Sequence, residues 1–134
     1  MDDCIFCKII KGELPSYKVY EDEYTYALLD IFPVNEYHTL VIPKKHYVDM
    51  FDIPEDELVS IMKTVKKIAD LYKTKLGINN IQIINNSGAE AQQIVFHIHF
   101  HIIPRYPGDD QNIILTKNPK LHENANELLQ KLND

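Results

Sequence analysis

Three histidines, His97, His99 and His101, alternate with single apolar residues. Successive side chains of a β-strand point to opposite faces, so in a strand the three imidazoles share one face, with their backbones about 6.5 to 7 Å apart. A neutral imidazole is a competent nucleophile near pH 7, because its unperturbed pKa is about 6.5. The pattern therefore favours nucleophilic catalysis, and the central His99 is the best candidate because it has a donor on each side.

Other interpretations of the three histidines need different chemistry. They could be solvated positions on an amphipathic strand, or they could bind a catalytic zinc ion with an open position for an activated water. The preceding segment 86–93 is rich in small residues and amides, which suits binding of a phosphate through neutral donors. We therefore favour covalent attack on phosphorus, which splits one difficult hydrolysis into two easier displacements. Attack needs one unprotonated ring nitrogen on His99, so we expect the other to donate to a main-chain carbonyl.

Two cysteines, Cys4 and Cys7, are separated by two residues. This spacer lets both thiolates reach one tetrahedral zinc ion at about 2.3 Å, so the pair is half of a zinc site. A redox pair or two buried thiols fit the same spacing. In a reducing compartment each of these is more common than a structural disulfide.

The periodicity of the apolar residues predicts the elements that must position these side chains. Three-four spacing indicates a long helix from Pro54 to Gly77 and a C-terminal helix over 119–132. Strands are expected at 17–20, 24–29, 38–42, 81–84 and 94–103. This order predicts an α+β fold with a mainly antiparallel five-stranded sheet, one long helix and a C-terminal helix.

Length and charge restrict the class of protein. The chain has 134 residues and a mass of 15.6 kDa, which predicts a single domain over 1–134. Its net charge of −6 leaves no basic surface for nucleic acid. The apolar runs are shorter than the roughly 20 residues of a membrane-spanning helix, and the acidic start Met1-Asp2-Asp3 lacks the basic region of a signal peptide. We therefore expect no membrane contact and a cytoplasmic location.

Taken together, these motifs resemble the histidine-triad family, whose signature is three histidines separated by single hydrophobic residues. The resemblance runs from Cys4 to Arg105 and includes Cys-Ile-Phe-Cys-Lys-Ile-Ile at 4–10, Ala-Leu-Leu-Asp-Ile at 27–31 and His-Thr-Leu-Val-Ile-Pro-Lys-Lys-His at 38–46. It implies a HIT-like fold and a nucleotide-binding hydrolase. Its substrates would be adenosine or guanosine 5′-phosphoramidates, and a nucleotidyl group on His99 would be the intermediate. A dinucleoside polyphosphate hydrolase and a nucleotide-binding adaptor with incidental hydrolysis stay open.

The resemblance also implies roles for individual residues. His101 would contact the phosphate or the leaving group, and His38 would lie behind the nucleophile and orient it. Asn86 and Gln93 would hold phosphate or leaving-group oxygens. Asp30 would accept hydrogen bonds from the ribose, and the walls of the base pocket would be Phe6, Ile9, Leu28 and Ile31.

The resemblance implies a structural zinc site, because some relatives with the same cysteine pair complete one with the residues that correspond to His46 and His97. The resemblance further implies a homodimer in which the long helix and a sheet edge meet their copies. The chain departs from the family pattern at Tyr37 and Gln92, which stand where glycine is usual, and it has no tryptophan. These departures concern the geometry of the loops and the choice of leaving group.

Overall fold

The computed structural model describes residues 3–134, in which five strands form one antiparallel sheet in the order β1-β2-β3-β5-β4. The strands are β1 (Lys18–Glu21), β2 (Thr25–Leu29), β3 (Thr39–Pro43), β4 (Ile81–Ile84) and β5 (Phe100–Pro104). The helices are α1 (Ile5–Ile10), α2 (Glu55–Leu76) and α3 (Ala125–Asn133), and two short 3₁₀ helices are η1 (Ala89–Ala91) and η2 (Pro119–Asn124). The predicted α+β class is confirmed.

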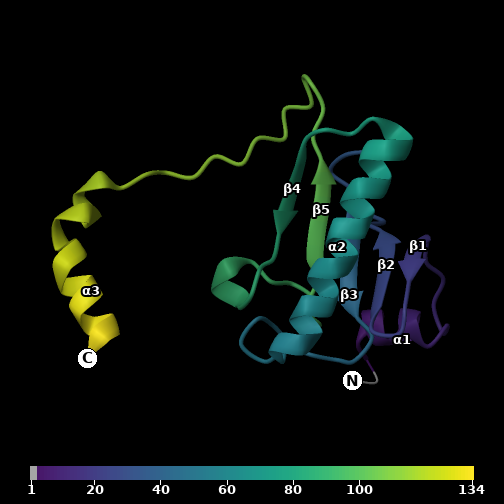
Figure 1. Ribbon diagram of the computed structural model, residues 1–134, viewed down its shortest axis with the longest axis horizontal. Helices are drawn as coiled ribbons and strands as arrows, with labels where there is room; N and C mark the ends of the chain where they lie inside the picture. The colour runs from purple at the N-terminus through teal and green to yellow at the C-terminus, as the bar shows by residue number, and fades with distance from the viewer. Residues whose placement is uncertain (1–2) are drawn as a thin grey trace.

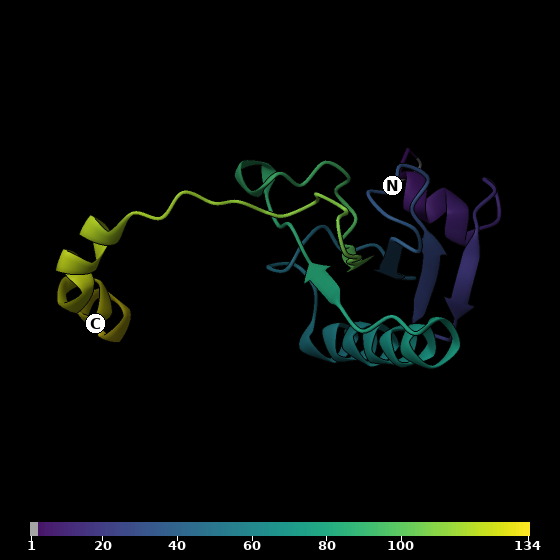
Figure 2. The same ribbon diagram turned by 90° about the horizontal axis from the view of Figure 1, so that it is seen from above.

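The long helix α2 covers one face of the sheet (Figures 1 and 2). Ile61, Val65 and Ile68 follow the predicted three-four spacing and are buried in the main core. The helix ends at Gly77, whose φ of 69° is a left-handed conformation that glycine adopts without strain. The predicted helix therefore agrees with the observed one to within a residue or two at each end.

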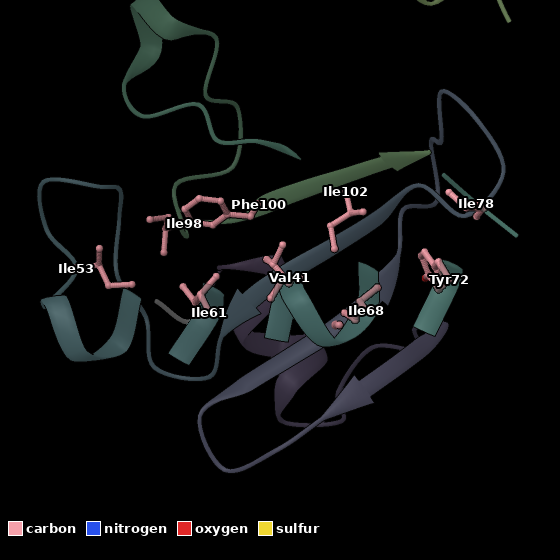
Figure 3. Close-up of a cluster of buried hydrophobic side chains, with 11 residues drawn as sticks. Val41, Ile53, Ile61, Ile68, Tyr72, Ile78, Ile98, Phe100 and Ile102 are labelled. Carbon is pink, nitrogen blue, oxygen red and sulfur yellow. The ribbon is translucent and has the colours of Figure 1, made fainter. Parts of the chain in front are cut away.

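The apolar residues between the triad histidines fill this core. Ile98, Phe100 and Ile102 are buried, and they lie beside Val41 and opposite Ile61 of α2 (Figure 3). Alternation along the segment therefore sends the histidines to the other face, as the sequence predicted.

The other face of the sheet carries a second, smaller core beneath α1. Phe6 of α1 packs with Tyr26 and Leu28 of β2 and with Leu40 and Ile42 of β3. These strand positions alternate with Ala27 and Val41, which belong to the core beneath α2. The helix α1 thus brings the N-terminal cysteines to the same face as the histidines.

The prediction of a strand over 94–103 is wrong at its start, because β5 begins only at Phe100. Its ladders with β3 and β4 are confined to residues 100–104, where the neighbouring strands provide partners. Before that point the main chain is held by a loop instead, since the amide of Ile98 donates to the carbonyl of Tyr47 at 2.7 Å. His97 and His99 consequently precede the strand, and only His101 lies within it.

The C-terminal segment leaves the body of the protein. Residues 109–112 are still hydrogen-bonded to the body, and beyond them the chain runs out as an extended arm that ends in η2 and α3, well away from the sheet (Figures 1 and 2). The prediction of one helix over 119–132 is therefore corrected to a 3₁₀ turn followed by a shorter α-helix. The large apolar side chains of this arm are exposed: Ile113, Ile114, Leu115, Leu121, Leu128, Leu129 and Leu132.

Within residues 3–134, no helix is both long enough and apolar enough to cross a membrane. The expectation drawn from the acidic start concerns Met1 and Asp2 as well, and these two residues lie outside the described part of the chain.

Candidate functional site

The triad divides between two neighbouring sites on the α1 face of the sheet. His97 is fully buried and its ring meets the N-terminal cysteines, whereas His99 and His101 line a cavity, with ring centroids 5.2 Å apart. Phe6 lies between the two sites, in edge contact with His97 at 5.7 Å and with His99 at 5.3 Å. The interpretation as solvated strand positions is wrong, because all three rings are buried or partly buried.

The ring of His99 is held in one tautomer. Its Nδ1 lies 2.8 Å from the carbonyl oxygen of His97, and a carbonyl only accepts, so Nδ1 carries the proton. The Nε2 atom of His99 is therefore unprotonated and has a lone pair. This is the arrangement that nucleophilic attack requires, and it agrees with the hydrogen bond expected from the sequence.

A second hydrogen-bonded chain fixes the tautomer of His101. The main-chain amide of Val34 donates to Nδ1 of His38 at 3.1 Å, so the proton of His38 is on Nε2. That Nε2 lies 2.9 Å from Nδ1 of His101 and donates to it. The proton of His101 is consequently on its own Nε2, which makes His101 a neutral donor.

The resemblance implied that His38 lies behind the nucleophile and helps orient it, and in the structure its neighbour in the site is His101. Its ring contacts His101, with centroids 5.1 Å apart, and its hydrogen bond goes to the same residue. The reason lies in the sheet, because β3 pairs with β5 and residue 40 is opposite His101. His38 lies just before β3, and its ring therefore contacts His101 in β5.

Burial keeps these imidazoles neutral at physiological pH. It lowers the pKa of His101 to about 4, with the nearby rings of His99 and His38 acting in the same direction. Burial also lowers the pKa values of His99 and His38 below the ordinary 6.5, although the carboxylate of Asp30 opposes this. A neutral nucleophile beside a neutral donor is the result.

The cavity beside these rings has a volume of about 940 Å³. Its size and mainly apolar walls are typical of a site for a small molecule. Nine residues named from the sequence as catalytic or substrate-binding line it: Phe6, Ile9, Leu28, Asp30, Ile31, Asn86, Gln93, His99 and His101. His38 is the remaining member of that set, and it lies behind His101.

Asp30 links the cavity wall to the chain of histidines. One carboxylate oxygen accepts a hydrogen bond from the amide of Phe32 at 2.9 Å, and the other lies 3.4 Å from Nε2 of His38. The carboxylate is partly exposed at the edge of the cavity. It can therefore accept hydrogen bonds from hydroxyl groups of a ligand.

The two amide residues proposed to hold oxygen atoms have different environments. Gln93 is buried, and its side-chain amide donates to the carbonyls of Val48 at 2.7 Å and Val95 at 3.1 Å. Its oxygen accepts from the amide of Gly88 at 2.8 Å, so the whole group is engaged in shaping the loop. A contact between this amide and a phosphate would require one of these bonds to break. Asn86 makes no side-chain hydrogen bond within residues 3–134, and its amide is available to a ligand in the cavity.

The four expected metal ligands lie together. Their ligand atoms are all within 4.8 Å of one another: Sγ of Cys4 and Cys7, and a ring nitrogen each of His46 and His97. The Sγ–Nδ1 distances are 3.4 Å for Cys4–His97, 3.4 Å for Cys7–His46 and 3.5 Å for Cys7–His97, and the two Nδ1 atoms are 3.2 Å apart. Bond lengths of about 2.3 Å to sulfur and 2.1 Å to nitrogen in a tetrahedron place such atoms about 3.4 to 3.6 Å apart. The set therefore fits zinc.

The surroundings of His97 prepare it as a metal ligand. Its Nε2 donates to the carbonyl of Pro43 at 2.9 Å, which leaves the lone pair on Nδ1, the atom that faces the cysteines. Burial lowers the pKa of His97 to about 4, so its ring is neutral. Burial, followed by the neighbouring Cys4, raises the pKa of Cys7 to about 11, and a bound metal ion would displace that proton.

The catalytic-zinc interpretation of the triad does not fit this arrangement. Among residues 3–134, His97, His99 and His101 form no common cluster of ligand atoms. Asp30, His38 and His101 do converge, but a metal on Nε2 of His38 would require a proton on Nδ1. The amide of Val34 points its own proton at that Nδ1, so this cluster suits hydrogen bonding.

Tyr37 and Gln92, which stand where the family usually has glycine, both keep a left-handed backbone, with φ of 65° and 72°. The ring of Tyr37 packs against Tyr72 of α2, with centroids 5.5 Å apart. Packing therefore holds Tyr37 in a conformation that glycine would adopt at no cost, and the loop before His38 keeps its turn.

Two contacts at the site had not been expected from the sequence. The side-chain amide of Asn85 donates to the carbonyl of His99 at 3.1 Å, and the main-chain amide of Val34 sets the tautomer of His38. A polar residue directly after a predicted strand is a weak signal for the first contact. Nothing in the side chain of valine could indicate the second, because the main chain makes it.

Comparison with known proteins identifies the class of protein that this fold and site define. The family model described as "HIT domain" matches residues 11–108, and the chain belongs to this family. An uncharacterised HIT-like protein of Methanocaldococcus jannaschii is 56% identical over 108 residues, which cover 81% of this chain and 83% of that protein. An adenosine 5′-monophosphoramidase of Candida albicans is 40% identical over 147 residues, which cover 98% of this chain and 94% of the enzyme.

Solved structures agree with the fold. A HIT family protein from Bacillus anthracis superposes with a TM-score of 0.89 at 40% identity, and the alignment covers 98% of this chain and 96% of that one. A zinc-bound histidine triad family protein from Mycobacterium smegmatis superposes with a TM-score of 0.79 at 36% identity, covering 90% and 87%. The HIT fold expected from the resemblance is therefore confirmed.

Proposed function

We propose that this nucleotide-binding hydrolase of the HIT family cleaves the phosphorus–nitrogen bond of adenosine or guanosine 5′-phosphoramidates, with His99 as the nucleophile. The observation that carries the proposal is the hydrogen bond from Nδ1 of His99 to the carbonyl of His97, which leaves Nε2 free to attack. The similarity to the Candida albicans adenosine 5′-monophosphoramidase supports this choice of substrate.

The proposed reaction has two displacements at phosphorus. In the first, Nε2 of His99 bonds to the α-phosphorus, the phosphorus–nitrogen bond of the substrate breaks, and the leaving nitrogen departs as an amine after taking up a proton from the solvent. In the second, water attacks the same phosphorus and releases a proton to the solvent, the bond to His99 breaks, and a nucleoside monophosphate is released. The Nε2–H of His101 donates a hydrogen bond to the phosphate or the leaving group in both steps. Preorganised donors of this kind are worth about 3 to 4 kcal/mol each.

The cavity offers a place for each part of the substrate. The base would lie against Phe6, Ile9, Leu28 and Ile31, which form an apolar wall, although Ile31 is itself largely exposed. Asp30 would accept hydrogen bonds from the ribose. Asn86 would donate to a phosphate or leaving-group oxygen, and Gln93 would act by shaping the loop that presents Asn86.

We further propose that Cys4, Cys7, His46 and His97 hold a structural zinc ion. Their tetrahedral spacing supports this assignment, and the zinc-bound Mycobacterium smegmatis relative agrees with it. The ion supplies a cross-link between α1, the segment after β3 and the triad. The chemistry at phosphorus is left to His99.

The cellular setting and the partners are proposed from the cysteine chemistry, the net charge and the exposed arm. Two free thiols as metal ligands suit the reducing cytoplasm. A net charge of −6 does not favour nucleic acid as a partner. A homodimer is supported by the C-terminal arm, whose apolar residues are exposed and could pack on a second copy.

A rapid-quench experiment tests the proposed activity. Wild-type protein is mixed with adenosine 5′-phosphoramidate labelled at phosphorus, and protein-bound label is measured during the first turnover. We expect a burst of nucleotidylated protein, which is absent from His99→Ala and His99→Gly and preserved in His122→Ala, a control on the exposed arm. If the enzyme hydrolyses the substrate but no label is ever found on the protein, the covalent mechanism is overturned.

A substrate panel separates the other candidates. Catalytic efficiency is compared for adenosine 5′-phosphoramidate, guanosine 5′-phosphoramidate and diadenosine polyphosphates. We expect the phosphoramidates to be preferred. A preference for dinucleotides would instead identify a polyphosphate hydrolase, and tight nucleotide binding with negligible turnover of every substrate would identify an adaptor.

A further inference from the structure

The main chain of the proposed nucleophile lies outside the sheet. The ladder of β5 with β3 runs no further back than Phe100, and its ladder with β4 begins at His101. The carbonyl of His99 therefore has no strand partner. It accepts a hydrogen bond from the side-chain amide of Asn85, at 3.1 Å, so a side chain takes the place of a ladder hydrogen bond.

Asn85 is itself held in one orientation. Because a carbonyl only accepts, the NH₂ group of Asn85 must face His99, and its oxygen must face the other way. That oxygen accepts from the hydroxyl of Ser87 at 2.8 Å, and the same hydroxyl accepts from the main-chain amide of Met50 at 3.0 Å. Three hydrogen bonds thus connect the main chain at Met50, in the loop that follows His46, to the main chain of His99.

We propose that Asn85 is a positioning residue that sets the direction from which His99 attacks its substrate; this inference rests on the proposed function. His99 is restrained at two points, its ring by the carbonyl of His97 and its own carbonyl by Asn85. Removing the second restraint leaves the partly buried carbonyl unpaired and lets the main chain turn. Because attack depends on the alignment of Nε2 with phosphorus, a small rotation reduces the rate without removing any contact with the substrate.

The neighbouring Asn86 provides a contrast. Asn86 lines the cavity and has a free amide, whereas Asn85 is not among the residues of the cavity wall and both its amide nitrogen and its amide oxygen are hydrogen-bonded. Asn86 is therefore expected to act on substrate affinity, and Asn85 on the rate of the covalent step.

The variants Asn85→Leu and Asn85→Asp test this. The leucine preserves size and removes both hydrogen bonds, and the aspartate keeps the acceptor for Ser87 while losing the donor to His99. Asn79→Leu is the matched control, because the Asn79 amide also donates to a main-chain carbonyl, that of Gly77 at 3.3 Å, on the exposed segment before β4. The rate of nucleotidylation is measured by single-turnover quench with saturating adenosine 5′-phosphoramidate, and the Kd for AMP by calorimetry.

We expect both Asn85 variants to form the adduct about tenfold or more slowly, with the Kd for AMP changed by less than about twofold. The control should match the wild type in both measurements. An unchanged rate in folded Asn85 variants would overturn the inference. So would a loss of AMP affinity as large as the loss of rate, because Asn85 would then be a binding residue.

A spectroscopic measurement keeps this result separate from the proposed activity. In the long-range ¹H–¹⁵N spectrum of the histidine side chains, the wild type should show His99 as a single Nδ1–H tautomer, and Asn85→Leu should show a broadened or mixed signal. If the wild type forms no adduct, the proposed function fails and this spectrum alone decides the role of Asn85. Identical His99 signals in wild type and Asn85→Leu would refute positioning.

Discussion

The Nδ1 atom of His99 lies 2.8 Å from the carbonyl oxygen of His97, so the residue that faces the cysteines with its ring holds the proposed nucleophile with its main chain. His97 therefore belongs to both sites. Any change that displaces its main chain also changes the tautomer and direction of the His99 ring. The cluster of proposed metal ligands and the cavity are consequently one structural unit, although only the cavity is proposed to hold a substrate.

Removal of the metal should act on the fold first and on catalysis through it. We expect Cys7→Ser to lose zinc and to lower the Tm by about 10 °C, because three remaining ligands hold the ion poorly and the cross-link to α1 is lost. Activity should fall in parallel with the thermal stability. Zinc content, Tm and the rate of phosphoramidate hydrolysis are measured on the same samples.

Treatment with a chelator distinguishes a structural zinc ion from a catalytic one. If the ion were catalytic, chelation would abolish activity at once while the Tm stayed constant. A structural ion predicts that the loss of rate follows the slower loss of folded structure. Lys8→Ala, on the same short helix as Cys7 but not a ligand, should leave both properties unchanged.

The hydrogen bonds from Val34 to His38 and from His38 to His101 predict that the effects of substituting the two histidines depend on each other. His38→Phe removes the donor to Nδ1 of His101, so the His101 ring is no longer held with its proton on Nε2. We expect the rate of hydrolysis to fall about tenfold. His101→Ala removes the donor to the substrate itself and should cost about 100- to 1,000-fold.

The double variant makes this prediction specific. If His38 acts only through His101, then His38→Phe has little further effect in the His101→Ala background, and the two losses are not additive. Steady-state rates of the wild type, both single variants and the double variant form the cycle. Additive losses would show that His38 acts on the reaction by a separate route.

Much of this architecture was predictable because it depends on side-chain periodicity. The alternation from His97 to Ile102 fixes which residues enter the core and which face α1, and the three-four spacing fixes the face of α2 that packs on the sheet. The two-residue spacer between Cys4 and Cys7 predicted half of a zinc site, and the resemblance to the family named the two histidines whose rings lie beside these cysteines. These features are local in the sequence or belong to a motif.

What could not be predicted depends on main-chain hydrogen bonds between distant segments. The tautomer of His38 is set by the main-chain amide of Val34. The side-chain amide of Gln93 donates both of its hydrogen bonds to the carbonyls of Val48 and Val95. The start of β5 is decided by where its neighbouring strands end, which the residues of β5 do not encode. A side chain that looks free in the sequence can therefore be fully engaged in the fold.

Stability should decrease in mild acid because of His101. The pKa of this imidazole is lowered to about 4 in the folded protein, by burial and then by the nearby rings of His99 and His38, whereas it is about 6.5 in an unfolded chain. Between these values the unfolded chain binds a proton that the folded chain does not, so the free energy of unfolding falls as the pH drops from about 6.5 to about 4. The slope approaches about 1.4 kcal/mol per pH unit for one such group.

Urea unfolding at several pH values between 7 and 4 measures this dependence. His101→Gln removes one titrating group and should reduce the slope over that interval, while His97, whose pKa is also lowered to about 4, keeps part of it. The slope above pH 7 should be unchanged. A variant profile parallel to that of the wild type would mean that His101 takes up its proton equally well in both states.

The exposed leucines of α3 should determine the oligomeric state. Leu128 and Leu129 are more than half exposed on a helix that lies away from the body (Figure 1), and an apolar surface of this kind is stable in water only when it is covered. If a second copy covers it, Leu128→Glu combined with Leu129→Glu converts a dimer into a monomer in sedimentation velocity. The body should stay folded, because the arm does not contribute to either core.

Lys131→Glu is the matched control, since it changes the net charge by the same two units without touching an apolar residue, and it should remain dimeric. A double variant that sediments as a dimer would show that other surfaces, such as α2 or an edge of the sheet, hold the copies together.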